Sequence, residues 1–370
     1  MKLTAQIASP FLNQFSASID SRTYITDETG LIVASPCPDQ HNRVHESAVT
    51  ALAAGEDRVA PDRLFLLVEH EGHVVGAIGM DGIADNAQLK HQLLRVLKIS
   101  LEATLGQLAV QAVLNYKQEA VDSFVADLIN PYHFDPEKLG KLALSLDINP
   151  AQQRTVFLIH IHEIVSQPRT DELKRKAIGK IKLETEQDTI VSFTGERLLF
   201  LCAHVKGIHP YAERKLAEQL HCSLALSGLQ AYIGIGRREA GMKGLRTSYF
   251  QALQSMRLLM KLDKDTRCAH IDDWGLISLI DSIPAELREQ FTSHYEFIQH
   301  LNPEMEETLE VFLESNLNTK EAADKLHLHR NTLLYRLEKL SETIELDPKK
   351  FNDALVYKFL LICKRLKISG

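Results

Sequence analysis

Short runs of β-branched and aromatic residues dominate the start of the chain. They lie at residues 23–26, 31–34, 64–69 and 73–80. Turn-forming residues, Asp-Glu-Thr-Gly at 27–30 and Glu71-Gly72, separate them in pairs, so each pair predicts a β-hairpin. Apolar residues at helical spacing in 1–20, with a bend near Pro10, and in 45–54 predict helices packed on this small sheet.

The pattern from about residue 88 to residue 130 keeps helical spacing without a proline. A helix of this length is well beyond the mean for globular proteins. Two interpretations stay open, because periodicity alone does not separate them. The helix carries contacts between two copies of the chain, or it is simply a long core helix.

Strands and helical segments alternate in the middle of the chain, which predicts an α+β domain. The strands are expected at 155–162, 189–193, 198–202 and 231–235. Asn130-Pro131 and Trp274-Gly275 mark the borders of this domain, and an all-helical region follows. The predicted domains are residues 1–130, 131–274 and 275–370.

Residues 318–340 predict two short helices joined by a tight turn. Asn318 or Thr319 is placed to cap the first helix. The apolar side of the second helix consists of Leu333, Leu334, Leu337 and Leu340. A last helix is expected to pack behind the pair through Phe351, Leu355, Phe359 and Ile362.

The polar side chains of this helix pair are of types that bind nucleic acid. Arginine binds guanine edges or phosphates through two hydrogen bonds, asparagine binds adenine, and hydroxyl groups reach phosphates. An ordinary amphipathic helix pair is the alternative, but acidic residues lie mostly before the pair whereas basic ones gather at its turn and second helix. The candidate DNA contacts are Thr319, Lys320, His329, Arg330, Asn331, Thr332, Tyr335 and Arg336.

Composition changes this picture little. The 370 residues carry a formal net charge of −7, so any DNA contact must come from a local patch. The five cysteines are scattered singly, which fits a reducing cytoplasm. Neither a signal-peptide core nor an apolar segment of membrane length is apparent, so a cytoplasmic location without a membrane partner is expected.

The C-terminal segment LHRNTLLYRLEKLSETIELDPKKFNDALVYKFLL closely resembles the helix-turn-helix of the carbohydrate (sugar) diacid regulators and of the related purine catabolism regulators. Its HRNTLxYRL core begins at His329. The resemblance implies a transcription regulator with a DNA operator as its partner. Because one helix-turn-helix reads only a half-site, a homodimer or higher homo-oligomer is expected.

The N-terminal segments ITDETGLIVAS, His45-Glu46-Ser47 and GHVVGAIGMDG resemble the diacid-recognition domain of the same family. That resemblance implies a PAS-like sensor of a small carboxylate such as glycerate, glucarate or galactarate. Carboxylates need cationic or hydrogen-bond donors. The candidate ligand residues are Arg43, His45, Glu46 and Arg58, with His41, Arg63 and Arg22 as further donors. Each is alternatively a solvated loop charge.

The middle domain, including GIGRREAGMKGLRTSYFQALQSM, resembles the degenerate GGDEF-like domain of these regulators. A diguanylate cyclase needs paired carboxylates for divalent ions and a glycine turn for phosphates. Here the turn is Thr194-Gly195-Glu196-Arg197-Leu198, so we expect no catalysis, cofactor or metal. In the segment His160-x-His162-Glu163, the two histidines alternate along a predicted strand, so their side chains share a face and fit a metal site. Half-buried strand histidines without a metal are the more common alternative.

The sequence thus predicts an α+β multidomain protein: a PAS-like sensor, a degenerate GGDEF-like domain and an all-α helix-turn-helix domain. The function it favours is a ligand-responsive DNA-binding transcription activator. The alternatives are a cyclic-dinucleotide signalling enzyme and a nucleotide-binding interaction module.

Overall fold

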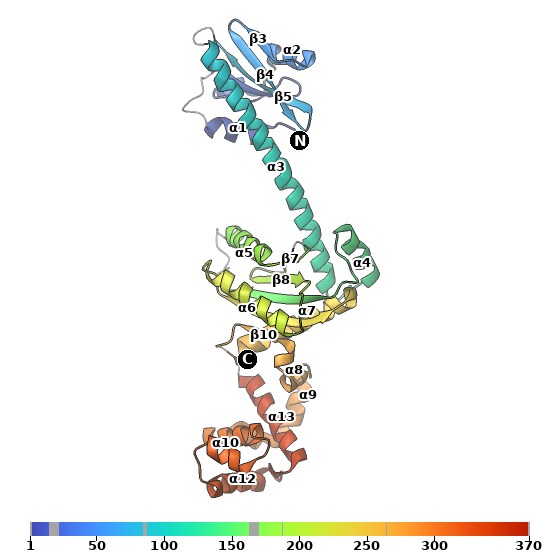
Figure 1. Ribbon diagram of the computed structural model, residues 1–370, viewed down its shortest axis with the longest axis vertical. Helices are drawn as coiled ribbons and strands as arrows, with labels where there is room; N and C mark the ends of the chain where they lie inside the picture. The colour runs from blue at the N-terminus through green and yellow to red at the C-terminus, as the bar shows by residue number, and fades with distance from the viewer. Residues whose placement is uncertain are drawn as a thin grey trace. The chain divides into compact units, whose positions relative to one another are not determined.

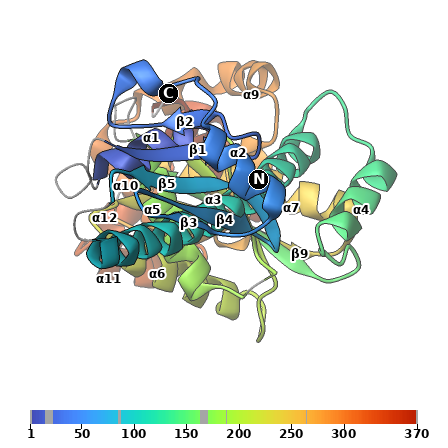
Figure 2. The same cartoon turned by 90° about the horizontal axis from the view of Figure 1, so that it is seen from above.

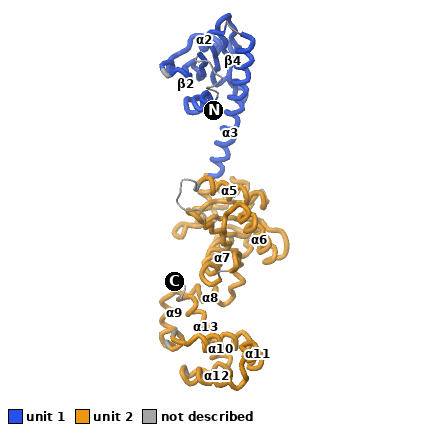
Figure 3. Tube along the Cα trace, turned by 90° about the vertical axis from the view of Figure 1, so that its left-hand side faces the viewer, with its two compact units in different colours: residues 1–118 blue, residues 119–370 orange. Residues whose placement is uncertain are grey.

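The computed structural model describes residues 2–14, 22–83, 87–162, 170–186, 188–263 and 265–368. These residues form two compact units, Met1–Gln118 and Glu119–Gly370 (Figures 1 and 3). The border falls inside one helix, α3 (Ala87–Ile129), which is the long helix expected from the sequence. The finer borders between residues 131–274 and 275–370 stay predictions.

The first unit is built on one antiparallel sheet with the order β2-β1-β5-β4-β3 (Figure 2). Its strands are β1 (Thr23–Asp27), β2 (Ile32–Ala34), β3 (Arg58–Ala60), β4 (Arg63–His70) and β5 (His73–Asp81). Both predicted hairpins are present, whereas β3 was not predicted. A short 3-10 turn, η1 (Pro38–Gln40), precedes α2 (Glu46–Ala54).

Alternating side chains give each face of this sheet its own core. In β4, Leu64, Leu66 and Val68 pack with α1 (Ala5–Gln14) and α3 on one face. Phe65 and Leu67 point the other way and pack against α2. Helix α2 ends at Gly55, whose left-handed φ of 68° suits glycine, as its sequence predicts.

The second unit contains a five-stranded sheet of order β10-β9-β6-β8-β7. Its strands are β6 (Arg154–Ile161), β7 (Ile190–Phe193), β8 (Leu198–Ala203), β9 (Ala231–Glu239) and β10 (Cys268–His270). Strand β10 was not predicted, and it is the one that pairs in parallel, with β9. This domain confirms the predicted mixture of helices and strands.

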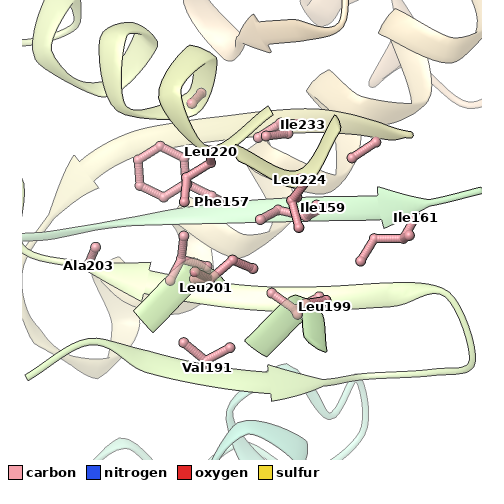
Figure 4. Close-up of a cluster of buried hydrophobic side chains, with 14 of the residues drawn as sticks. Phe157, Ile159, Ile161, Val191, Leu199, Leu201, Ala203, Leu220, Leu224 and Ile233 are labelled. Carbon is pink, nitrogen blue, oxygen red and sulfur yellow. The ribbon is translucent and has the colours of Figure 1, made fainter. Parts of the chain in front are cut away.

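Helices cover both faces of the second sheet. One face packs with α5 (Thr170–Glu184) and α6 (Tyr211–Ala225) through side chains such as Phe157 and Leu220 (Figure 4). The other face packs with α4 (Pro136–Ser145), α7 (Gly241–Leu262) and the end of α3.

The remainder of the second unit is helical, as predicted. The 3-10 turns are η2 (Ile271–Asp273) and η3 (Ser293–His300). The α-helices are α8 (Leu276–Asp281), α9 (Ala285–Thr292), α10 (Pro303–Glu314), α11 (Thr319–Lys325), α12 (Arg330–Ile344) and α13 (Phe351–Ile368). Among the described residues, no helix is both long enough and apolar enough to cross a membrane.

The prediction for the packing face of α13 was wrong. Phe351 and Leu355 are 69% and 48% exposed, and Phe359 and Ile362 pack in a separate cluster with Leu258 of α7. Helix α13 has apolar residues on more than one side, so periodicity alone could not say which side meets the helix pair. The residues of α13 that pack behind the pair are Tyr357, Leu360 and Leu361.

The hydroxyl of Tyr357 closes the C-terminal end of α12. It lies 3.2 Å from the carbonyl oxygen of Leu340 and 3.0 Å from that of Leu346, and its one hydrogen is donated to either oxygen. Burial raises the pKa of this phenol. The contact joins α13, the end of α12 and the loop between them.

Removal of this hydroxyl by Tyr357→Phe should leave buried carbonyl oxygens without their partner. We expect the C-terminal helical region to lose about 1–3 kcal/mol of stability. Thermal unfolding followed by circular dichroism checks this. Tyr335→Phe is the matched control, because Tyr335 is 66% exposed, and an equal effect of both substitutions would contradict the role of the Tyr357 hydroxyl.

Candidate DNA-binding surface and effector site

The helix pair predicted from residues 318–340 is formed by α11 and α12. The side-chain oxygen of Asn318 accepts hydrogen bonds from the backbone N–H groups of Lys320 and Glu321, at 3.0 and 3.2 Å. Asn318, rather than Thr319, is therefore the cap of α11. Ala322 and Ala323 are buried, and their small size lets α11 pack closely against its neighbours.

A tight turn links the two helices. His327 has a positive φ of 52°, and the N–H of Leu328 donates to the carbonyl of Ala323 at 2.9 Å. Helix α12 then starts after His329, whose Nδ1 accepts from the N–H of Asn331 at 3.3 Å. The predicted DNA contact His329 thus also caps the second helix.

Helix α12 separates apolar and polar side chains as its sequence predicts, except that Leu334, expected on the buried side, is only half-buried. Leu333, Leu337 and Leu340 are fully buried. The remaining predicted DNA contacts are exposed, apart from Thr319 and Arg336, which are half-buried. The exposed ones are Lys320, His329, Arg330, Asn331, Thr332 and Tyr335. Because helix N-termini also favour anions, the start of α12 suits a phosphate-bearing partner.

Arg336 is held by the protein itself. Its Nη1 donates to the hydroxyl of Thr308 at 2.9 Å, and its Nη2 lies 3.1 Å from Oε2 of Glu304. Both partners lie on α10, so these bonds fix α12 against α10. The sequence does not predict this positioning role, because Glu304 lies 32 residues away along the chain. That Arg336 contacts DNA stays a prediction.

The predicted ligand residue His45 lies on the α2 face of the first sheet. Its ring contacts Tyr24 of β1 and Phe65 of β4, with ring centroids 5.1 and 4.7 Å apart. Gly79 of β5 makes room for Phe65, because a Cβ at this glycine would lie 2.1 Å from the Phe65 ring. His45 immediately precedes α2 and makes no side-chain cap, so its ring is available for other contacts.

His45 belongs to a group of polar side chains that we call the His45 cluster: His45, Ser47, Arg63 and Asp81. Nε2 of His45 lies 3.4 Å from Oδ2 of Asp81. Nε of Arg63 lies 3.7 Å from Oδ1 of Asp81, and its Nη1 donates to the hydroxyl of Ser47 at 3.3 Å. The cluster therefore joins the start of α2 to the start of β4 and the end of β5.

Parts of the His45 cluster lack hydrogen-bond partners. Nδ1 of His45 and Oδ1 of Asp81 are buried, and neither makes a hydrogen bond within the described chain. Burial, followed by the negative charge of Asp81, raises the pKa of the adjacent Tyr24. Unpaired buried polar atoms are costly unless water or a ligand reaches them.

The other predicted ligand residues lie outside this cluster. Arg43, Glu46 and Arg58 are exposed, and in the described part of the chain none of the three forms an ion pair. Asp81 and Ser47 had not been considered as ligand contacts. Asp81 lies 36 residues from His45, and only the pairing of β4, β5 and α2 brings them together.

The middle domain has the expected turn between β7 and β8. The turn contains one carboxylate, Glu196, next to Arg197. His160 lies at the end of β6 beside this turn, and burial, with a contribution from Arg197, lowers its pKa. Of its proposed partners, His162 is exposed and Glu163 lies outside the described residues.

One group in the described chain brings two histidines and a carboxylate together: His209, His270 and Asp272. Several of its ligand atoms are already engaged by the protein, although the buried Nε2 of His270 makes no hydrogen bond to the described residues. Nδ1 of His270 accepts from the N–H of Asp272 at 3.1 Å, and the Asp272 carboxylate is paired with Arg237 at 2.7 Å. This arrangement supports the link between β10 and η2, and we assign no metal to it.

Three family models match the chain in sequence order. A sugar diacid recognition model matches residues 3–128, a GGDEF-like domain model matches residues 133–258, and a PucR C-terminal helix-turn-helix model matches residues 305–362. The second match confirms the predicted nature of the middle domain, and the third confirms the helix-turn-helix.

Relatives with similar domains span the whole chain. The carbohydrate diacid regulator of Escherichia coli (strain K12) is 24% identical over 373 residues, covering 96% of each chain. The protein YsfB of Bacillus subtilis (strain 168) is 23% identical over 359 residues, covering 92% of this chain and 93% of YsfB. The DNA-binding transcriptional activator AdeR of the same organism is 30% identical over 166 residues, covering 42% of this chain and 39% of AdeR.

The helix-turn-helix geometry, the three ordered family matches and the full-length relative agree with one another. The chain is a DNA-binding transcription regulator with a sugar diacid recognition domain and a PucR-type helix-turn-helix, and it is similar along nearly its full length to a carbohydrate diacid regulator.

Proposed function

We propose that this transcription regulator senses a small hydroxycarboxylate through its N-terminal unit and activates transcription in response. The observation that carries the proposal is the His45 cluster, in which cationic and acidic groups meet next to the start of α2 and two buried polar atoms make no hydrogen bond within the described chain. It lies in the segment that matches the sugar diacid recognition model.

The chemistry of the cluster fits a ligand that has both carboxylate and hydroxyl groups. Arg63 and the free N–H groups at the start of α2 donate to a carboxylate. Asp81 accepts from a hydroxyl group. Glycerate, glucarate and galactarate each offer both kinds of group, whereas a simple fatty acid offers one.

Arg58 is well placed to extend this site. It is the cross-strand partner of Phe65, so the two side chains share the face of the sheet on which His45 lies. Arg43 and Glu46 flank His45 in the chain. We propose that these three exposed residues contact the outer end of the ligand, and that the unit is a PAS-like sensor.

Ligand binding would shift a population of domain arrangements, since a ligand favours the state that it binds more tightly. We further propose that the active form is at least a dimer, because two half-sites need two helix-turn-helix units. A cytoplasmic location follows from DNA as the partner.

Calorimetry of the full-length protein with glycerate, glucarate and galactarate tests the sensor. At least one compound should release or absorb heat on binding, and Arg63→Ala should weaken that binding about tenfold or more, because a bond to a charged group is lost. His45→Ala should also weaken it. His73→Ala, an exposed histidine of β5, is the matched control. If none of the three compounds gave a heat of binding, the proposed effector class would be wrong.

Arg330→Ala tests the DNA-binding surface. Loss of a two-bond contact to a base should cost about 1–3 kcal/mol in affinity for the cognate operator. Gel-shift titration at a fixed salt concentration measures this. Glu342→Ala, at an exposed position further along α12, serves as the control and should not weaken binding. Unchanged affinity of the Arg330 variant would show that this residue is not a contact.

The second candidate function is a cyclic-dinucleotide enzyme, favoured by the GGDEF-like match at residues 133–258. We propose that the domain is not catalytic, because the β7–β8 turn has one carboxylate beside an arginine where two metal ligands are needed. Incubation with GTP and Mg²⁺ should yield no cyclic dinucleotide. Product formation would establish the enzyme instead, and retention of labelled nucleotide without turnover would indicate a nucleotide-binding module.

A further inference from the structure

Helix α3 has a second apolar stripe, on the side away from the core of its own unit. Residues 94, 97, 101 and 105 are leucines that are buried against the first sheet. The large apolar members of the second stripe are Leu89, Val96, Ile99, Val110 and Val113. Each of these five side chains is at least 60% exposed.

The spacing of the second stripe is that of a coiled coil. Intervals of three and four residues alternate without a break through Leu89, Gln92, Val96, Ile99, Ala103, Gly106, Val110 and Val113. Such a repeat averages 3.5 residues and keeps one side chain of every half-heptad facing a partner helix. The four leucines that pack against the first sheet occupy other positions of the same heptad. The residues of the second stripe are therefore not needed for the packing of this unit.

The last part of the stripe lies where α3 has little support from its own chain. No residue between positions 107 and 117 is buried. A short helical segment without tertiary packing is marginal in water. Here it also exposes several large apolar side chains at once, namely Leu108, Val110, Val113, Leu114 and Tyr116. A partner that covers this segment would stabilise the helix and remove the apolar side chains from water.

We propose that α3 pairs in parallel with α3 of a second copy of this chain, through a contact that we call the α3 seam. The seam consists of the eight residues at positions 89, 92, 96, 99, 103, 106, 110 and 113. The stripe contains no charged residue, and the same stripe on both copies meets the requirement of a two-fold interface.

The residues beside the seam fit this partner. In a parallel pair, Arg95 of one copy faces Ser100 of the other, and Glu102 faces Gln107, so no like charges meet there. Leu114 and Tyr116 widen the apolar contact at its end. Apart from its chain neighbours and the backbone of its own helix, a Cβ at Gly106 would find no atom within 4 Å, which leaves space for a close helix approach.

The parallel order, unlike the seam itself, rests on the proposed function. Two half-sites on one operator need two helix-turn-helix units on the same side of the dimer, and a parallel pair brings the same ends of both helices together. The antiparallel order would bring opposite ends together.

The mass of the full-length protein in solution tests the seam, without DNA or effector. Light scattering after size exclusion should give two chains for the unaltered protein. The double variant Val110→Glu with Val113→Glu should give one chain, because charges replace the apolar contact. The matched control, Gln111→Glu with Ala112→Glu, adds the same charge to exposed positions of the same turn and should stay at two chains. One chain for the unaltered protein, or two chains for the Val110 and Val113 variant, overturns the proposal.

A single cysteine tests the parallel order. Val113→Cys should form an interchain disulfide on mild oxidation, because the same position of both helices meets in a parallel seam. Ala112→Cys and the unaltered protein give the background, since the natural Cys222 is exposed. A two-chain mass without a disulfide specific to position 113 overturns the parallel order.

These outcomes are separate from those of the effector test. A one-chain mass together with normal effector binding refutes the seam and leaves the sensor intact. A two-chain mass with no heat for any hydroxycarboxylate refutes the sensor and leaves the seam intact.

Discussion

A recognition helix can present its polar side to DNA only if its other side is held firmly, and in this protein α12 is held from both ends. Arg336 ties its first half to Glu304 and Thr308 of α10. The hydroxyl of Tyr357 closes its last turn from α13. Between these contacts, Leu333, Leu337 and Leu340 are fully buried. The exposed start of α12, with Arg330 and Asn331, depends on this support.

The N-terminal unit differs from the pair of α11 and α12 because some of its buried polar groups make no hydrogen bond within the described chain. The His45 cluster places a carboxylate, an imidazole and a guanidinium at distances of 3.4 and 3.7 Å, longer than good hydrogen bonds. A site built in this way can exchange internal contacts for those of a ligand. The two units thus differ in physical character: one is well packed behind the surface that is proposed to bind DNA, and the other has polar atoms without hydrogen bonds to described residues where an effector is proposed to bind.

Local chemistry could be predicted from the sequence, and long-range pairing could not. The two hairpins, the end of α2 at Gly55 and a helix cap at Asn318 or Thr319 depend on residues a few positions apart, and they were predicted correctly, with the structure selecting Asn318 as the cap. Strands β3 and β10 have three residues each and exist because a neighbouring strand pairs with them. The partners of His45 and of Arg336 lie 36 and 32 residues away, so only the fold reveals them. The face of α13 was misjudged because the helix has apolar residues on more than one side.

The central claim is that this chain is a regulator whose α12 reads DNA sequence. Selection of binding sites from a random DNA pool by the full-length protein tests it most directly. The account predicts enrichment of a sequence with two related half-sites, and loss of that enrichment when Arg330 and Asn331 are both replaced by alanine. A pool that stays random, or the same enrichment with the double variant, would contradict it.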